Sequence, residues 1–533
     1  MRFNRLITLW EFYISHFRFF KFENFAVYHP SLLLNKLIRL FRLLFLLLLY
    51  DYYIHGAQNS TMSISFEPNE DDTIGPLMAR LEKMLEGEGY SFFDVEEFED
   101  LIEFQFFFGD LERAEKTIAL ALEQHPSTMS LLVKQAQLLL WTDKGENALN
   151  LLSTVEAIDP LNADIFRTRG AIYSQMNRHD DAIEQLNKAA EVDESEDVGM
   201  IYMEIANEYM TLGQYEKAIE HFHLAISNDF AMDNVLTELS VCYDLGDRLD
   251  EGIAYFETFI DENPYNADAW LSLGLLLYRL ELYEKAIEAH DYALAIDPFY
   301  VAAILNKANA YFAMGRYFQA IRIYKEAFEM EDPEAMSIYC MGECYEKLEK
   351  YPQAIENYKK ALELDDLLSD AWVGIGVCLS EQGNYEGALR NIHRAIEIEP
   401  SNAEFWFILA DTQLSAGLND EAIISFRKVA VMEPENADIW LEFSHLYAEQ
   451  EDFQAAIDVL NEGIGHQPEN PAHYYRLVCY LHYLGKKKES LLVLSHALQA
   501  YYDLYTSMLE YAPRLSEEPE YINLIEQYKP SND

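Results

Sequence analysis

The sequence is poor in cysteine and in positive charge for its length. Five cysteines occur in 533 residues, which is too few for a disulfide framework and is typical of a reducing compartment. Only 39 Lys and Arg stand against 92 Asp and Glu, so the formal net charge is −53. Such a chain would repel the phosphates of a nucleic acid, which excludes nucleic acid as an expected partner. Half of the residues are apolar, which excludes a disordered acidic chain and predicts a large packed core.

The sequence also lacks an uninterrupted apolar run of the length that a membrane-spanning helix needs, about 20 residues. The best candidate, Leu32 to Tyr50, is interrupted by Lys36, Arg39 and Arg42. Residues 1–61 nevertheless differ from the rest of the chain. They are rich in Phe and Leu and carry seven cations and three anions, a net +4, which leaves −57 for the remainder. A helix would place the three cations near one face, and this pattern suits an interfacial membrane anchor.

A second interpretation is that the native protein begins at Met62 and that residues 1–61 are not part of it. No methionine lies between Met1 and Met62, and the acidic stretch after Met62 reads like a natural start. This interpretation predicts a cytoplasmic protein, whereas an N-terminal anchor predicts a membrane-associated assembly or secretion factor. In both cases, residues 62–94 are expected to form an acidic tail and an N-terminal capping helix, with Leu77 and Leu81 on its apolar face.

A 34-residue period organises residues 95–504. Trp372, Trp406 and Trp440 are spaced by 34 residues, and Trp270 lies three periods before Trp372. Twelve units follow this period, with a single step of 36 residues. They begin at Val95, Met129, Ala163, Gly199, Asp233, Ala267, Val301, Ala335, Ser369, Ala403, Ala437 and Pro471. Such self-similarity predicts one repeat array rather than three or four independent domains.

Two positions of the repeat carry small side chains. Position 20 is Ala in ten units, with Gly252 and Ser490 in the other two, and position 8 is usually Gly, Ala or Ser. Apolar residues at positions 4, 7, 8 and 11 form one helical stripe, and those at 20, 21, 24, 27 and 28 form a second. Because small residues let two helices approach closely, each unit is predicted to be a helical hairpin that crosses at positions 8 and 20. The fold class is therefore all-α.

These markers make the units resemble the tetratricopeptide repeat. In one unit the pattern consists of Trp270, Leu273, Gly274, Tyr283, Ala286, Ala293 and Pro298, and the unit from Trp372 to Pro400 matches equally well. The resemblance covers residues 95–504 and implies an α-solenoid, a right-handed superhelix of helical hairpins whose first helices line a concave groove. Because a solenoid must cover its exposed ends, residues 505–533 are expected to form C-terminal capping helices and a tail.

The resemblance implies that positions 2, 5, 9 and 12 of each unit face the groove. Candidate partner-binding residues at these positions are Met200, Met203, Asn207, Met210, Leu271, Leu275, Tyr278, Leu305, Asn309, Phe312, Tyr339, Phe407 and Tyr475. Apolar walls would take the side chains of a peptide, and Asn207 and Asn309 could hold its amides. The alternative is that some of these residues only pack against neighbouring turns. The surrounding acidic residues favour a basic or apolar-basic partner.

Motifs for catalysis, cofactors and metals are weak in this sequence. Gly374 and Gly376 resemble the start of a dinucleotide fingerprint, but the third glycine and the preceding strand are missing. Cys340 and Cys344 are one helical turn apart without two further ligands nearby, so packing explains them better than metal binding. We expect no enzyme activity, no cofactor and no metal. The predicted function is a non-enzymatic scaffold that binds a protein or peptide in the groove.

Overall fold

The computed structural model describes residues 74–87, 89–193, 198–228 and 235–530. The predictions for residues 1–61, for a start at Met62 and for the acidic tract before the capping helix lie outside these ranges. Within them, all regular structure is helical. The chain divides into two compact units, one that ends at Leu101 and one that begins at Ile102, and each is described by itself below.

The first unit contains α3 (Ile74–Leu85) and the beginning of α4 (Val95–Phe107). The apolar spacing predicted a short helix here, and α3 buries Leu77 and Leu81. Arg80 joins α3 to α4 because its Nη1 lies 2.7 Å from Oε1 of Glu97. The same guanidinium lies 4.4 Å from the centre of the Phe93 ring, so one arginine makes both an ion pair and a cation–π contact.

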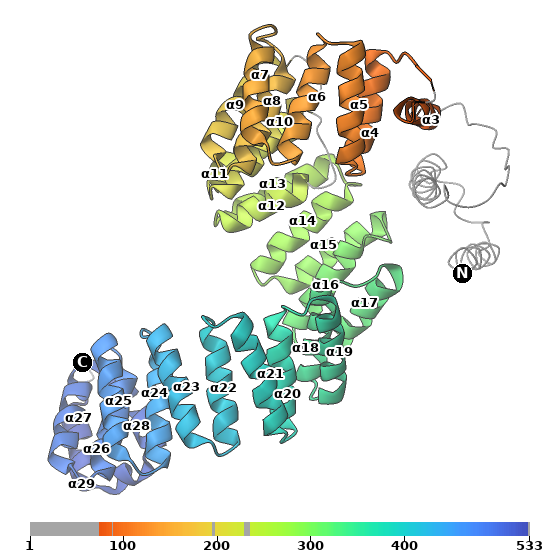
Figure 1. The fold of residues 1–533 in the computed structure, drawn as a ribbon. Coiled ribbons are helices and arrows are strands. Elements are labelled where there is room, and N and C mark those ends of the chain that lie inside the picture. The colour runs from red at the N-terminus through yellow and green to blue at the C-terminus, as the bar shows by residue number, and fades with distance from the viewer. Residues whose placement is uncertain (1–73, 88, 194–197, 229–234, 531–533) are drawn as a thin grey trace. The chain divides into compact units, whose positions relative to one another are not determined.

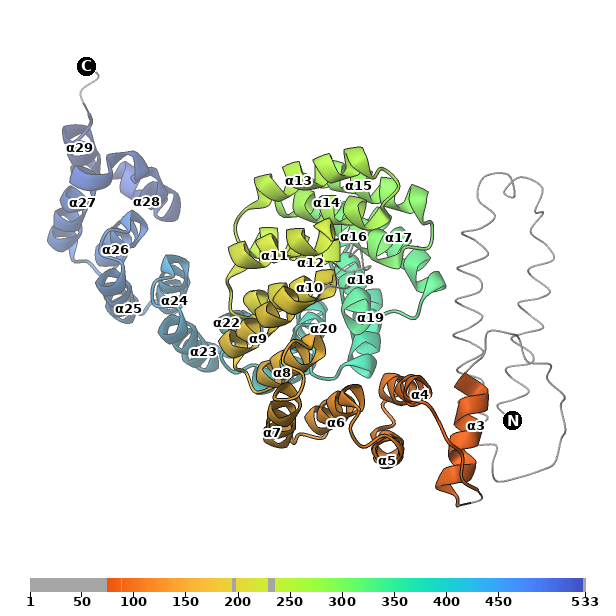
Figure 2. The same cartoon turned by 90° about the horizontal axis from the view of Figure 1, so that it is seen from above.

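The second unit is a series of antiparallel helical hairpins that follow one another in chain order, and neighbouring helices lie side by side (Figures 1 and 2). α4 contributes its second half to this unit. The first helices of the next hairpins are α6 (Met129–Trp141), α8 (Ala163–Gln175), α10 (Val198–Thr211), α12 (Val235–Leu245), α14 (Ala267–Arg279), α16 (Val301–Ala313), α18 (Ala335–Lys347), α20 (Ser369–Glu381), α22 (Ala403–Ser415), α24 (Ala437–Glu449) and α26 (Pro471–Tyr483).

The second helices alternate with them along the chain. They are α5 (Leu111–Gln124), α7 (Gly145–Glu156), α9 (His179–Val192), α11 (Tyr215–Ser227), α13 (Leu249–Glu262), α15 (Tyr283–Ile296), α17 (Tyr317–Met330), α19 (Tyr351–Leu364), α21 (Tyr385–Ile398), α23 (Asn419–Met432), α25 (Phe453–His466) and α27 (Lys487–Tyr501). In every 34-residue repeat except two, the first helix begins at the residue where the repeat was predicted to begin. α10 begins one residue early, and α12 begins at the first described residue after 234.

Local signals explain where the first helices begin. The side chains of Asn162, Asn266, Asn402 and Asn470 accept a hydrogen bond from a backbone N–H in the first helical turn. The repeating tryptophan secures the turn before it. The indole Nε1 of Trp270 donates to the carbonyl of Pro264 at 3.1 Å, and Trp372, Trp406 and Trp440 make the equivalent bond. The tryptophans recur at multiples of 34 residues because each one hydrogen-bonds the loop that connects its hairpin to the preceding one.

The turn inside each hairpin contains a left-handed residue at position 15. Six units place glycine there, and the others place Asp143, Asn177, Asp247, Glu281, Glu349 and Glu451 at φ values of 56° to 59°. A left-handed residue lets the chain leave the first helix and bond back to its last carbonyls. In unit eight, the N–H of Lys350 donates to the carbonyl of Tyr345 at 2.9 Å.

The predicted crossing point is where the helices of a hairpin come closest. The alanines at position 20 have no exposed surface, and the glycines at position 8 face position 24 of the same hairpin. A Cβ added to Gly376 would lie 2.5 Å from Cγ1 of Ile392 and 3.3 Å from the carbonyl oxygen of Ala388. Position 8 therefore packs under the side chain at 24 and against the backbone at 20.

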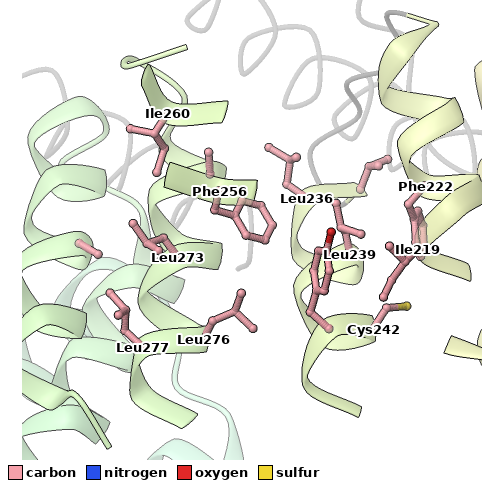
Figure 3. Packing of buried hydrophobic residues seen from close by; sticks show 14 of the residues in the cluster. Ile219, Phe222, Leu236, Leu239, Cys242, Phe256, Ile260, Leu273, Leu276 and Leu277 are labelled. Carbon is pink, nitrogen blue, oxygen red and sulfur yellow. The ribbon is translucent and has the colours of Figure 1, made fainter. Parts of the chain in front are cut away.

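Buried apolar side chains run continuously from one hairpin to the next. Figure 3 shows the cluster in which Phe222 of α11, Leu239 of α12 and Phe256 of α13 meet Leu273 and Leu276 of α14. At the other end, α28 (Thr506–Tyr511) and α29 (Pro519–Gln527) pack against the last hairpin, together with short 3₁₀ turns. Each hairpin thus buries its apolar stripes against its neighbours, as a repeat array requires.

Candidate protein-binding face

All thirteen candidate residues lie on first helices, but two of them are buried inside the array. Leu271 is 3% exposed, because the small Ala303 at the start of α16 lets that helix pack over it. Tyr475 is 1% exposed and donates its hydroxyl to the carbonyl of Tyr501 at 2.7 Å, within the core that the C-terminal helices cover. Neither side chain can reach a partner in this structure, and the binding proposal below is built without them.

The methionines of α10 form a half-exposed patch. Met200, Met203 and Met210 are partly buried, and Asn207 beside them is exposed. Arg167 of α8 contacts the sulfur of Met200 and pairs with a carboxylate of α10, its Nε lying 2.9 Å from Oε1 of Glu204. This ion pair restrains one edge of the patch.

Aromatic candidates on later first helices rest on rings of the second helices. The ring centres are 5.4 Å apart for Tyr278 and Tyr283, 5.5 Å for Phe312 and Tyr317, 5.5 Å for Tyr339 and Tyr358, and 5.8 Å for Phe407 and Phe426. Each of these first-helix rings therefore packs with one side against the second helix, and its side chain remains partly exposed. Leu275 and Leu305 are likewise half-buried.

A pocket of about 410 Å³ lies where α16, α17 and α18 meet. It brings together Leu305 and Asn309, which were predicted, with residues that were not predicted to bind a partner. The unpredicted lining residues include Ala302, Tyr324, Glu331, Glu334, Met336 and Cys340. Burial raises the pKa of the Cys340 thiol to about 11, so it lines the pocket as an uncharged, weakly polar group at neutral pH.

Asn309 is oriented in this pocket by a tyrosine from the second helix of its own hairpin. The hydroxyl of Tyr324, which is 1% exposed, donates to Oδ1 of Asn309. This bond fixes which end of the Asn309 amide is the oxygen and directs its NH₂ group away from the tyrosine. The NH₂ group can then donate to the backbone carbonyl of a bound peptide.

The charge of the face has one sign. From the fourth to the eleventh unit, no Lys or Arg stands at position 2, 5, 9 or 12. The charged residues at these positions are all acidic: Asp244, Asp268, Glu343, Glu346, Asp370, Glu404, Asp411 and Asp438. Asp244 is paired with Arg279 at 2.8 Å, and Asp268 accepts the hydroxyl of Tyr300 at 2.5 Å. The carboxylates of units eight to eleven give the face its negative potential.

Tyr358 connects the interior of the array to one of these carboxylates. Its ring lies between Gly342 of α18 and Gly374 of α20, where an added Cβ would come within 2.7 Å and 2.6 Å of ring carbons. Its hydroxyl donates to Oε2 of Glu346 at 2.7 Å. Glycine at both positions therefore makes room for a buried ring whose hydroxyl reaches a carboxylate of the face. This packing also confirms that Gly374 and Gly376 serve helix contacts, on α20, rather than a nucleotide loop.

Two further carboxylates lie beside Tyr339 between α18 and α20. Burial raises the pKa of Glu343, and the nearby charges of Glu346 and Asp370 raise it further. Burial also raises the pKa of Asp370, with help from the charge of Glu399. A hydrogen bond with Tyr339 opposes the shift of the Glu343 pKa, and so does the charge of Lys347, an exposed neighbour on α18. Burial is the larger cause of both shifts and the neighbouring carboxylates add to it, so a cation bound beside Glu343 and Asp370 would favour their charged forms.

The described residues contain no group of three His, Cys, Asp or Glu side chains that could hold a metal ion. Cys242, Cys344 and Cys378 are buried, and burial raises the pKa of each thiol. Of the helices within residues 74–530 that the structure describes, none has the length and apolar character that crossing a membrane requires.

Sequence profiles of known families identify the class of protein. Profiles of the tetratricopeptide repeat match residues 168–196, 201–231, 243–301, 339–389, 379–437 and 414–478. A profile described as anaphase-promoting complex, cyclosome, subunit 3 matches residues 280–361. Together with the consecutive helical hairpins that the described residues form, these matches show that the chain is a tetratricopeptide-repeat protein.

Individual relatives are distant. The TPR repeat-containing protein YpiA of Bacillus subtilis (strain 168) is 24% identical over 211 residues, which is 39% of this chain and 49% of YpiA. BBSome complex member BBS4 of Bos taurus is 27% identical over 160 residues, 30% of each chain. The matched region thus spans about half the length of the first relative and less than a third of the second.

Solved structures also match parts of the chain. The APC/C hetero-tetramer Cut9-Hcn1 is 15% identical with a TM-score of 0.36, covering 86% of this chain and 95% of that chain. YrrB, described as a TPR protein with an unusual peptide-binding site, is 23% identical with a TM-score of 0.29, covering 34% of this chain and 93% of its own. The repeat fold is established by the family profiles and by the described helical hairpins. The fold is that of a protein–protein interaction scaffold, and scaffolds of this class are generally non-enzymatic.

Proposed function

We propose that this protein is a non-enzymatic scaffold that binds a segment of another protein on the first-helix face of its repeat array. The observation that carries the proposal is the pocket between α16 and α18. It is lined by Leu305 and Asn309 at two predicted groove positions, and by the exposed Met336 at a third. A concave apolar site with a few oriented polar groups is the usual form of a binding site.

The chemistry of the face supports a basic or apolar-basic partner. The half-exposed apolar side chains offer contact area, and the amide of Asn309 offers a donor for a peptide carbonyl. The carboxylates and the absence of Lys and Arg at the groove positions of units four to eleven disfavour an acidic partner. We further propose a cytoplasmic location, which the five free cysteines support.

The proposal is tested by quantitative crosslinked capture from the source cells, with the full chain as bait. In one variant, Leu305, Met336 and Phe407 are each replaced by Ser. In a matched control, the exposed Leu364, Ile424 and Leu492 of second helices are replaced by Ser. We expect the first variant to lose the partner that the wild type and the control recover. Circular dichroism checks that each variant is folded. Equal recovery by all three proteins would contradict binding on the first-helix face.

A further inference from the structure

The helix α18 presents two different surfaces to a partner, on adjoining faces. Met336 and Cys340 line the pocket toward α16, whereas Tyr339, Glu343 and Glu346 lie toward α20. Residues three and four apart share one side of a helix, so Met336, Cys340 and Glu343 are neighbours and the two surfaces adjoin. A segment that runs along α18 toward its C-terminal end would therefore meet the apolar cavity first and the carboxylates next.

We propose that the pocket and these carboxylates form one two-part site for an extended peptide that carries an apolar side chain close to a lysine or arginine. This inference rests on the proposed function, because it assigns the site and the partner's chemistry on the same face. The apolar side chain enters the pocket between α16 and α18. The cation lies against Glu343 and Asp370, with the Tyr339 ring beside it.

The pocket suits an apolar side chain better than an acidic one. Val301, Ala302, Leu305 and Met336 supply apolar surface, and Met336 is 51% exposed, so it can move over a bound group. Glu331 and Glu334 add carboxylates at the edge, on the connection between α17 and α18. Because no cation lines the pocket, an acidic side chain would be buried there without a partner.

The second part of the site suits a cation because its carboxylates lie near one another and little positive charge lies beside them. Glu343 is flanked by the charges of Glu346 and Asp370, and Lys347 offsets them only from an exposed position. Glu346 is held in place by the hydroxyl of the buried Tyr358. A fixed carboxylate loses little conformational entropy when it binds a cation, so its position is pre-organised for binding.

The geometry of α18 sets the spacing between the two groups of the peptide. Glu343 follows Cys340 by three residues and Met336 by seven, which corresponds to about 5 to 10 Å along the helix. An extended peptide rises about 3.3 Å per residue, so the apolar and the basic residue are separated by about two or three positions.

The experiment uses a random peptide library displayed on phage and selected on the immobilised full chain. We expect the enriched sequences to share an apolar residue and, two or three positions away, a Lys or Arg. A fluorescent synthetic peptide of the enriched sequence is then titrated by anisotropy. Replacing its basic residue by Gln is expected to weaken binding about fivefold, the upper range for a partly exposed ion pair.

A double-mutant cycle links this loss to the proposed carboxylates. Glu343→Gln and Asp370→Asn are each expected to weaken the original peptide severalfold and to leave the Gln-substituted peptide unchanged. Glu363→Gln, an exposed carboxylate on the second helix of the same hairpin, is the matched control and should have no effect. Because one arm of the cycle changes only the peptide, the test does not depend on how well the variants fold.

Four outcomes would overturn the proposal. If the enriched peptides lack a basic residue, or if the peptide's basic residue shows no coupling to Glu343 or Asp370, the two-part site is wrong while the proposed function stands. If no sequence is enriched, or if the enriched peptides bind equally well after Leu305, Met336 and Phe407 are replaced by Ser, both the two-part site and the proposed function fail.

Discussion

His290 makes the array sensitive to acid. It occupies position 24 in α15, is 0% exposed, and packs against Gly274, where an added Cβ would lie 2.4 Å from the imidazole Cε1. Neither ring nitrogen has a hydrogen-bond partner within the described residues. Burial lowers the pKa of His290 to about 4, and the charge of Lys307 lowers it too, while that of Asp291 opposes them.

The sign of the effect follows from the two pKa values. In the unfolded chain, the pKa of a histidine is about 6.5, so between pH 6.5 and 4 the unfolded chain binds a proton that the folded array does not. Stability is therefore full above pH 6.5, falls as the pH is lowered and levels off near 4. Between pH 7.5 and 5 the loss from this one group is about 2 kcal/mol.

The perturbation is His290→Leu, because leucine fills position 24 in other units, for example Leu186. At pH 7.5 we expect the variant to be more stable by about 1 to 3 kcal/mol, since two unpartnered polar atoms leave the core. Between pH 7.5 and 5 it should lose about 2 kcal/mol less than the wild type. Ile392→Leu, at position 24 of another hairpin, controls for repacking without a titrating group.

The assay is native-state hydrogen exchange of peptides from α14 and α15, corrected for the intrinsic pH dependence of exchange. A local measurement is preferred because the repeats of an array can unfold locally and need not unfold in one transition. If the wild type and His290→Leu lose the same protection between pH 7.5 and 5, the assignment of a neutral, unpartnered His290 is refuted.

Three further predictions concern the hairpins and the face. Gly376→Ala should destabilise its hairpin by about 1 to 3 kcal/mol through the clash with Ile392, whereas Gly465→Ala, at an exposed helical glycine with open space around it, should be neutral or stabilising in thermal melts. Glu349→Gly should stabilise by about 1 kcal/mol in denaturant titrations, because it relieves a left-handed residue at φ 56°; a loss of stability would contradict this. Tyr358→Phe should leave the helical content unchanged in circular dichroism. It should weaken the binding of a basic peptide about threefold, because it removes only the hydrogen bond that holds the Glu346 carboxylate in place.

The hairpin register was predictable because it depends on residue size and period. A small residue at position 20 is required wherever two backbones touch, so Ala, Gly or Ser at this position located the crossing in each repeat. The left-handed turn at position 15 could be predicted from the sequence in only some of the repeats. Glycine signals it at Gly213 and Gly315, but Glu281 and Glu349 adopt the same backbone without any sign in residue type.

The binding face was less predictable than the fold. The repeat position of a residue determines its place on the helix, but it does not determine whether a neighbouring element covers its side chain. Leu271 and Tyr475 share the position of Leu305, yet a neighbouring helix buries one and the C-terminal segment buries the other. The tyrosines at position 24 could have been found. Tyr358 is a large residue between glycines on two first helices, which is a pattern of complementary sizes.

Site-specific photocrosslinking tests the central claim most directly. A photoreactive amino acid is placed at Met336 or at Phe407 on the first-helix face, and at Ile424 or at Leu492 on exposed second helices as controls. The account predicts that the two face positions crosslink to the same protein in the source cells and that the second-helix positions do not. Crosslinks to that protein from the second helices alone would contradict it.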